Sequence, residues 1–91
     1  MYKVYQLNIG KETYIGCTSM PITRRLSSHR SRASNVTNIG YNLAISKAIR
    51  KAGLFEMTAT ILHQFKDKSQ AYRKEAMLIK KHQPTLNVQG K

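Results

Sequence analysis

The chain has 91 residues, enough for a single domain with one modest core, and 41% of them are hydrophobic. Sixteen lysines and arginines against four acids give a net charge of +12, which is typical of proteins that bind polyanions, most often nucleic acid. The single cysteine excludes an internal disulfide, and no apolar run approaches the roughly 20 residues of a membrane-spanning helix. Charge alone therefore favours a non-catalytic nucleic-acid binder over an enzyme.

Turn signals and hydrophobic periodicity divide the chain into six elements. In chain order we expect a strand, a strand, a helix, a helix, a strand and a helix, at residues 2–7, 13–17, 21–33, 41–52, 55–63 and 67–81. The turn sequence Asn8-Ile9-Gly10-Lys11 joins the first two strands into a hairpin. Pro21 suits the first turn of the first helix, with Thr18 or Ser19 as a nearby cap.

The second half of the chain begins with the clearest helical pattern. Apolar residues recur at i, i+3, i+4, i+7, i+8 and i+11 between Tyr41 and Ala52, and Gly53 supplies the stop. Asp67 or Ser69 caps the last helix. Because a two-stranded hairpin alone is marginal, the third strand is expected to join it. The prediction is an α+β fold, a small three-stranded antiparallel sheet flanked by three helices.

Glu75 is the first residue whose position in the sequence is not explained by packing alone. It lies on the same stripe of the last helix as Ala71 and Leu78, together with His82. Charged side chains rarely face a core unless they are paired or bound to a cation. A position at the edge of the stripe, with a surface pair to a nearby lysine, is the alternative interpretation.

Arg25 and His29 form a second group of candidate site residues. They are four residues apart, hence neighbours on the first helix, and they lie within or beside its apolar face. An arginine beside apolar packing can present a preorganised fork to phosphate. On this helix alone, a snorkelling arginine and a half-buried histidine are the simpler interpretation.

Two tyrosines complete the set of candidates. Tyr5 in the first strand and Tyr14 in the second would face one another across the hairpin. Gly16 would leave the backbone there open to a close ligand. Paired tyrosines on a sheet more often serve packing than chemistry.

In combination, these residues resemble the GIY-YIG nuclease domain family over essentially the whole chain, as one domain of residues 1–91. The matching residues, in order, are Val4-Tyr5, Tyr14-Ile15-Gly16, Arg25-Leu26, His29, Glu75 and Asn87. The family includes phage and intron homing endonucleases, some restriction enzymes and a nuclease of bacterial excision repair. Two departures stand out: the first motif lacks its glycine, and Cys17-Thr18 occupies the place where some relatives carry a lysine.

The resemblance implies a metal-dependent endonuclease that hydrolyses phosphodiester bonds in DNA. Glu75 would hold one divalent ion, Mg²⁺ or Mn²⁺, through a single carboxylate, with waters and substrate phosphate as the other ligands. Arg25 would clamp the scissile phosphate, and Tyr5 would position or deprotonate the attacking water. Tyr14 and His29 would hydrogen-bond the water, the phosphate or Tyr5. A phenol pKa near 10 is too high for this role, so the metal and Arg25 are expected to lower it.

Basic side chains on the first two helices are expected to track the nucleic-acid backbone without reading its sequence. They are Arg24, Arg30, Arg32, Lys47, Arg50 and Lys51, and Asn87 is expected to anchor the tail or to contact phosphate.

We expect a monomer of low sequence specificity that nicks double-stranded DNA, in the cytoplasm of a bacterial or phage-infected cell and with no membrane partner. A homodimer or an accessory protein is the alternative source of specificity. A non-catalytic DNA- or RNA-binding protein on the same fold is the alternative function. A protein that acts on another protein is a third hypothesis, with no residue in direct support.

Overall fold

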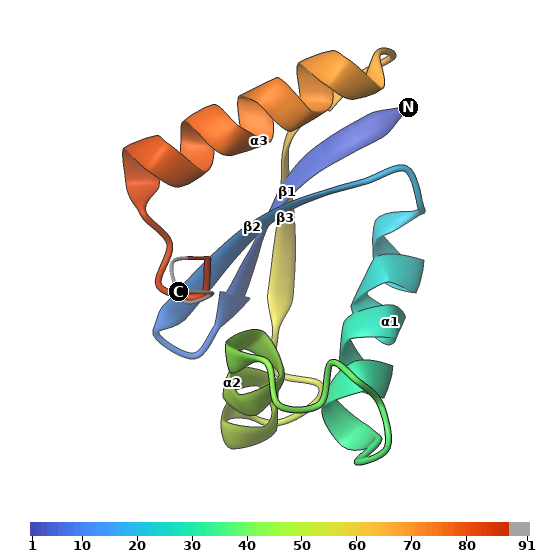
Figure 1. Cartoon of the computed structure of the whole chain (residues 1–91), viewed down its shortest axis with the longest axis vertical. Coiled ribbons are helices and arrows are strands. Elements are labelled where there is room, and N and C mark those ends of the chain that lie inside the picture. The colour runs from blue at the N-terminus through green and yellow to red at the C-terminus, as the bar shows by residue number, and fades with distance from the viewer. Residues whose placement is uncertain (88–91) are drawn as a thin grey trace.

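The computed structural model describes residues 1–87, and its elements follow the predicted order (Figure 1). They are β1 (Tyr2–Ile9), β2 (Glu12–Thr18), α1 (Ile22–Ser34), α2 (Ala44–Ala52), β3 (Thr58–Phe65) and α3 (Lys68–His82). The three strands form one antiparallel sheet in the order β2-β1-β3, which confirms the predicted α+β fold. Among the helices described, none has the length and apolar character needed to cross a bilayer.

The sheet carries a hydrophobic core on each face, because side chains of the central strand β1 alternate between the two faces. Beneath α1 and α2 the buried residues are Tyr5, Leu7, Ile9, Ala33, Ile45, Ala48, Ile49, Met57 and Leu86. Beneath α3 they are Val4, Ile15, Ala71 and Leu78. Helices α1 and α3 therefore cover opposite faces, with the edge strand β2 between them in Figure 1.

Helix α1 begins without the side-chain cap that the sequence suggested. Pro21 is itself the N-cap residue, and its carbonyl accepts hydrogen bonds from the backbone N–H groups of Arg24 and Arg25. The Thr18 hydroxyl accepts instead from the backbone N–H of Met20, at 3.0 Å. Thr18 therefore shapes the turn before the helix rather than its first turn.

Two other elements begin about three residues later than the sequence predicted. Helix α2 begins at Ala44, because residues 41–43 continue the turns of the preceding loop. Strand β3 begins at Thr58 rather than Phe55, because a turn closed by a hydrogen bond from Glu56 N to Gly53 O comes first. At the start of α3 the expectation was confirmed, since Asp67 accepts a hydrogen bond from the backbone N–H of Ser69.

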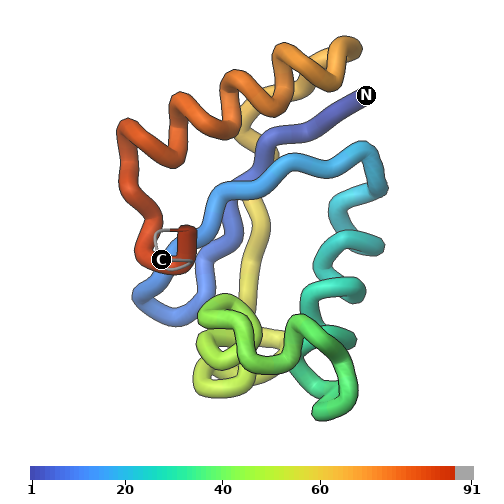
Figure 2. The backbone as a smooth tube through the Cα atoms, viewed as in Figure 1, coloured from blue at the N-terminus to red at the C-terminus, as the bar shows by residue number. Residues whose placement is uncertain are grey.

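After α3 the chain returns to the outer edge of β2 (Figure 2). Leu86 donates its backbone N–H to the Thr13 carbonyl at 3.1 Å. The Asn87 carboxamide then pairs with the backbone of Ile15, accepting from its N–H at 2.7 Å and donating to its carbonyl at 2.9 Å. One side chain thus takes the place of a neighbouring strand and satisfies backbone groups that an edge strand leaves unpaired.

Candidate active site

The hydroxyl of Tyr5 is the centre of a buried hydrogen-bond network. Its Oη lies 3.1 Å from His29 Nε2 and accepts a hydrogen bond from Arg25 Nε, also at 3.1 Å. Tyr5 is fully buried and His29 is 3% exposed, whereas Arg25 is half-buried. Arg25 and His29 reach the same hydroxyl because they are one turn apart on α1, which packs over the face of β1 that carries Tyr5.

Gly16 makes the room in which the Tyr5 side chain lies. The strand register pairs Gly16 with Tyr5 and Tyr14 with Leu7. The two tyrosines are therefore diagonal neighbours on one face, with ring centroids 6.4 Å apart, and not the opposed pair that was expected. A Cβ at position 16 would lie 2.6 Å from Tyr5 Oη and 2.9 Å from Tyr14 Cε2. Our expectation of an open backbone at Gly16 was wrong, because the two rings cover it.

Burial determines the protonation states in this network. Burial, together with the smaller effects of the Arg25 and Arg32 charges, lowers the pKa of His29 from 6.5 to about 4. Burial also raises the pKa of Tyr5, and the hydrogen bond from Arg25 offsets only part of that rise. We expected Arg25 and a metal ion to lower the pKa of the Tyr5 phenol. Without a metal ion, Arg25 does not bring that pKa below its ordinary value.

These protonation states fix the direction of the hydrogen bonds. At neutral pH the phenol keeps its proton and the imidazole is neutral, so His29 has one donor and one acceptor nitrogen. Tyr5 Oη accepts from Arg25, and within residues 1–87 His29 Nε2 is the only acceptor in reach of the phenol proton, so we assign Tyr5 as the donor of this bond. His29 then carries its proton on Nδ1. The Tyr14 ring meets the imidazole edge-on, with centroids 5.7 Å apart, and helps to hold its plane.

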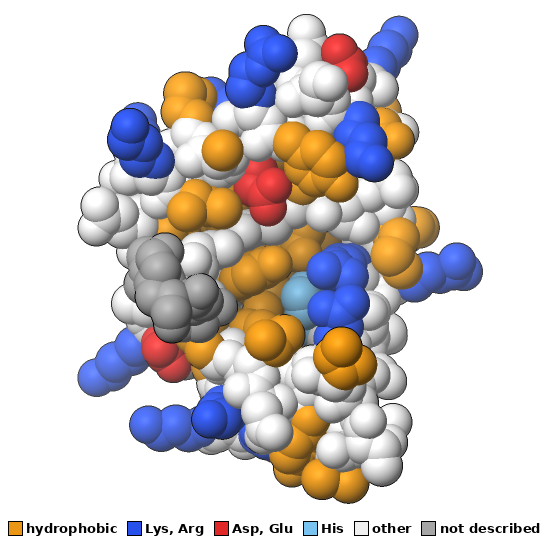
Figure 3. Space-filling model, viewed as in Figure 1, with side chains coloured by type: hydrophobic (Ala, Val, Ile, Leu, Met, Phe, Trp, Pro, Cys, Tyr) orange, Lys and Arg blue, Asp and Glu red, His pale blue; other side chains and the backbone are white. Residues whose placement is uncertain are grey.

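Glu75 belongs to the same region although it comes from the opposite side of the sheet. It is half-buried on α3, and its charge raises the pKa of Tyr5, Tyr14 and Cys17. Burial is the only resolved cause of the raised pKa of Glu75 itself, so within residues 1–87 no lysine pairs with it strongly enough to lower that pKa. Figure 3 shows an acidic side chain on one wall of a hollow, with a histidine and basic side chains on the other.

The basic residues expected to follow a nucleic-acid backbone divide into two groups. Arg30 and Arg50 are engaged within the fold. Arg30 Nε donates to the Leu54 carbonyl at 3.0 Å. Arg50 Nη1 donates to the carbonyls of Ala33 and Tyr41, each at 2.8 Å, and its guanidinium lies 3.8 Å from the centre of the Tyr41 ring. The remaining members, exposed or half-buried, are Arg24, Arg32, Lys47 and Lys51.

Arg32 is closer to the candidate site than the sequence analysis anticipated. Its charge lowers the pKa of both His29 and Tyr14. The signal was present in the sequence, since positions 25, 29 and 32 follow the i, i+4, i+7 spacing of one helix face. By contrast His82, on the predicted stripe of Glu75, is exposed at the end of α3.

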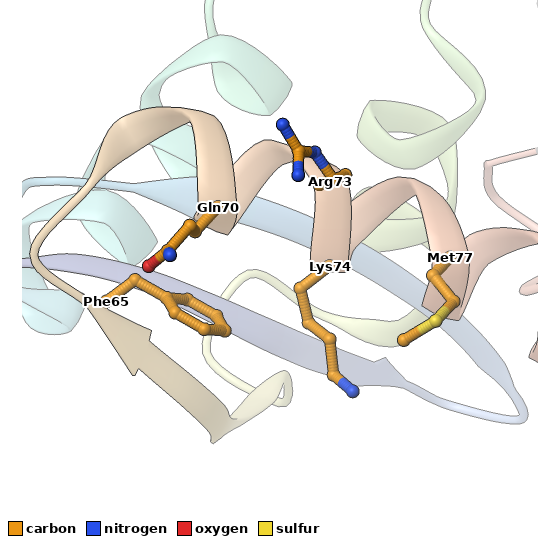
Figure 4. A pocket seen from close by; sticks show the side chains of 5 residues that line it. All are labelled: Phe65, Gln70, Arg73, Lys74 and Met77. Carbon is orange, nitrogen blue, oxygen red and sulfur yellow. The ribbon is translucent and has the colours of Figure 1, made fainter.

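A cavity of about 310 Å³ between the end of β3 and α3 has a different character (Figure 4). It is lined by Phe65, Gln70, Arg73, Lys74 and Met77, with the Arg73 side chain directed away from the Phe65 ring. None of the predicted site residues takes part, and the lining contains neither a carboxylate nor an imidazole. We therefore place the candidate site at the hollow and not here.

Comparison with protein families identifies the family of the chain. Residues 1–87 match the family model described as the GIY-YIG catalytic domain, which places the chain among the nucleases. The chain belongs to the GIY-YIG family. No curated protein and no solved structure matched it.

The residues present are compatible with the divalent ion on which nucleases of this family generally depend. Within residues 1–87 no three His, Cys, Asp or Glu side chains gather in the way that an all-protein metal centre requires. A single half-buried carboxylate suits Mg²⁺ or Mn²⁺, which are bound through one or two carboxylates plus water and substrate phosphate. Because burial raises the pKa of Glu75, the positive charge of an ion would also favour the ionised form that binds it.

Proposed function

We propose that this protein is a metal-dependent endonuclease that nicks double-stranded DNA. The observation that carries the proposal is the buried network of Tyr5, Arg25 and His29, together with the half-buried Glu75, whose charge acts on the Tyr5 hydroxyl. A protein that only binds the DNA backbone needs surface cations and none of these buried groups. The net charge of +12 supports a polyanionic substrate.

Each residue has a role in the proposed hydrolysis. Arg25 binds a non-bridging oxygen of the scissile phosphate, and its hydrogen bond to Tyr5 preorganises the guanidinium for that contact. Water attacks phosphorus and forms the new P–O bond while the bond to the leaving oxygen breaks. Tyr5 Oη takes the proton of the attacking water as its own proton passes to His29 Nε2, and solvent protonates the leaving oxygen.

The acceptor of the relay begins in its neutral form. Because the pKa of His29 is about 4, the imidazole is unprotonated at physiological pH, and burial and the charges of Arg25 and Arg32 oppose its protonation until the substrate is bound. The negative charge that develops on the phosphate during attack favours the protonated imidazole and raises its pKa. Glu75 would hold the divalent ion, which would supply charge stabilisation to the phosphate oxygens when bound.

Four basic side chains are proposed to contact the DNA: Arg24, Arg32, Lys47 and Lys51. Each phosphate contact releases counterions, so binding should weaken steeply as salt rises. We propose that a monomer cuts one strand in each encounter, with low sequence specificity and in the cytoplasm of a bacterial or phage-infected cell. A homodimer or an accessory protein would show itself as paired cuts or as cutting that requires the partner.

The test is nicking of supercoiled plasmid with Mg²⁺, Mn²⁺ or EDTA, using the wild type, Glu75→Gln and Glu56→Gln. Glu56 is an exposed acid, so its variant makes the same change in charge away from the hollow. We expect metal-dependent nicking by the wild type and by Glu56→Gln, and a loss of at least roughly 100-fold in Glu75→Gln. DNA binding and its salt dependence should stay the same in all three proteins.

Tight, salt-sensitive DNA binding without nicking in any divalent metal would overturn the proposal. The protein would then be a DNA- or RNA-binding protein that keeps the nuclease fold. Nicking by Glu75→Gln at the wild-type rate would keep the activity but remove Glu75 from the metal site.

A further inference from the structure

A cavity of about 440 Å³ opens where the end of α1 meets the loop of residues 35–43. It is lined by Arg32, Asn38, Ile39, Gly40 and Leu43. Arg32 also belongs to the electrostatic environment of the candidate active site, because its charge lowers the pKa of His29 and Tyr14. Because Arg32 follows His29 by three residues on α1, the cavity and the proposed phosphate site lie along the same helix.

The loop that forms the cavity is held in place by buried hydrogen bonds. The Ser46 hydroxyl, from α2, donates to the Gly40 carbonyl at 2.7 Å in a buried contact. Arg50, also from α2, ties the Tyr41 carbonyl to that of Ala33 at the end of α1. A ligand would meet a preformed surface and would not have to order the loop.

The side-chain polar groups of the cavity offer hydrogen-bond donors. The Asn38 Oδ1 already accepts from the backbone N–H of Gly40 at 2.7 Å, which leaves the Asn38 Nδ2 amide as a donor. The guanidinium of Arg32 contains donors only, and, unlike those of Arg30 and Arg50, it donates to no carbonyl within residues 1–87.

The rest of the lining consists of apolar side chains and a glycine. Ile39 is 98% exposed and Leu43 is 45% exposed, so both apolar side chains project into solvent beside the cavity. The aliphatic part of Arg32 passes so close to Gly40 that a Cβ there would lie 3.1 Å from Arg32 Cδ. The glycine thus lets the aliphatic part of Arg32, a lining residue of the cavity, lie close against the loop.

We propose that this cavity binds the major-groove edge of a guanine next to the scissile phosphate. Guanine presents two neighbouring acceptors, O6 and N7, whereas adenine and cytosine each present a donor and thymine presents one acceptor beside a methyl group. A donor-only pair of side chains therefore matches guanine and leaves an unmatched donor against the other bases. This inference rests on the proposed function and adds a guanine preference to an otherwise unspecific nuclease.

The test compares a short duplex with the same duplex in which every guanine is 7-deazaguanine, which lacks the N7 acceptor. Nicking with Mg²⁺ and equilibrium binding in EDTA are measured for the wild type, Arg32→Met and Arg24→Met. The methionine keeps an apolar stem but removes the donors. Arg24 is an exposed arginine of the same helix and serves as the control for lost charge.

For the wild type and Arg24→Met we expect nicks beside guanine and a loss of roughly tenfold on the modified duplex, in rate or in binding. For Arg32→Met we expect no difference between the two duplexes. Equal binding and equal nicking of both duplexes by the wild type would overturn the inference while leaving the nuclease in place. Guanine-dependent binding without nicking would support the guanine site and defeat the proposed nuclease.

Discussion

Replacing Gly16 with alanine should disrupt the active-site network without removing any hydrogen-bonding group. The added Cβ would lie 2.6 Å from Tyr5 Oη, 2.8 Å from Tyr5 Cζ and 2.9 Å from Tyr14 Cε2. Carbon atoms in contact are normally about 3.5–4.0 Å apart, so the rings must move by several tenths of an ångström or more. Tyr5 is fully buried, and a shift of its hydroxyl disturbs the hydrogen bonds to both Arg25 and His29.

The magnitude follows from these two effects. Inserting a methyl group into a packed site costs about 1–3 kcal/mol, and each weakened hydrogen bond adds up to about 1 kcal/mol. We expect Gly16→Ala to lose about 3 kcal/mol of the free energy of unfolding, a large share of the total stability of a small domain. A displacement approaching 1 Å among the reacting groups should lower nicking by about 100-fold.

The assay is urea unfolding of a double-mutant cycle. In Tyr5→Phe the atom nearest to the new Cβ is absent, so Gly16→Ala should cost about 1 kcal/mol less in that background than in the wild type. Thr13→Ala, on the same strand but with its side chain toward the other face, serves as the control. A loss below about 0.5 kcal/mol in Gly16→Ala, with nicking intact, would refute the packing argument.

Three further predictions concern other parts of the molecule. Between pH 6.5 and about 4 the unfolded state binds a proton at His29 that the folded state does not, so the free energy of unfolding should fall by up to about 3 kcal/mol as the pH drops. His29→Gln should flatten this fall in urea titrations. The titrations are best made in a Glu75→Gln background, because the raised pKa of Glu75 increases the free energy of unfolding as the pH drops. Arg50→Ala should lose about 2 kcal/mol of stability, whereas Lys47→Ala should leave stability unchanged and reduce only the salt dependence of DNA binding. Asn87→Ala should speed hydrogen exchange at the Ile15 amide, and unchanged exchange would show that the carboxamide does not hold that edge.

The order of elements was predictable because it depends on local signals. Turn residues marked the hairpin, periodicity marked the helices, and Asp67 marked the start of α3. Glu75, Arg25 and His29 became candidates for a related reason, since charged or polar side chains conflicted with apolar helix faces, and the family resemblance then favoured a site over simple packing. Local conflict of this kind is often visible in a sequence when a site is built on regular elements.

The details of the network depend on non-local geometry and were not predictable. The pairing of Gly16 with Tyr5 follows from the hairpin register, and a shift of one residue would change which side chains share a face. Arg50 looked like a surface cation, and only the docking of α2 against α1 places its guanidinium on two carbonyls. The raised pKa of Tyr5 results from burial, which depends on all the elements packed around it.

Glu75 lies on α3, on the opposite face of the sheet from the helix that carries Arg25 and His29. This arrangement bears on when the proposed site is complete during folding. The two halves of the proposed site are anchored in different hydrophobic cores, so neither half forms a complete site alone. A chain still being synthesised, or one from which α3 has detached, holds the tyrosine, arginine and histidine without the carboxylate. In the proposed mechanism, cutting would thereby be coupled to the docking of the last helix, and a copy without that helix would lack the carboxylate that hydrolysis requires.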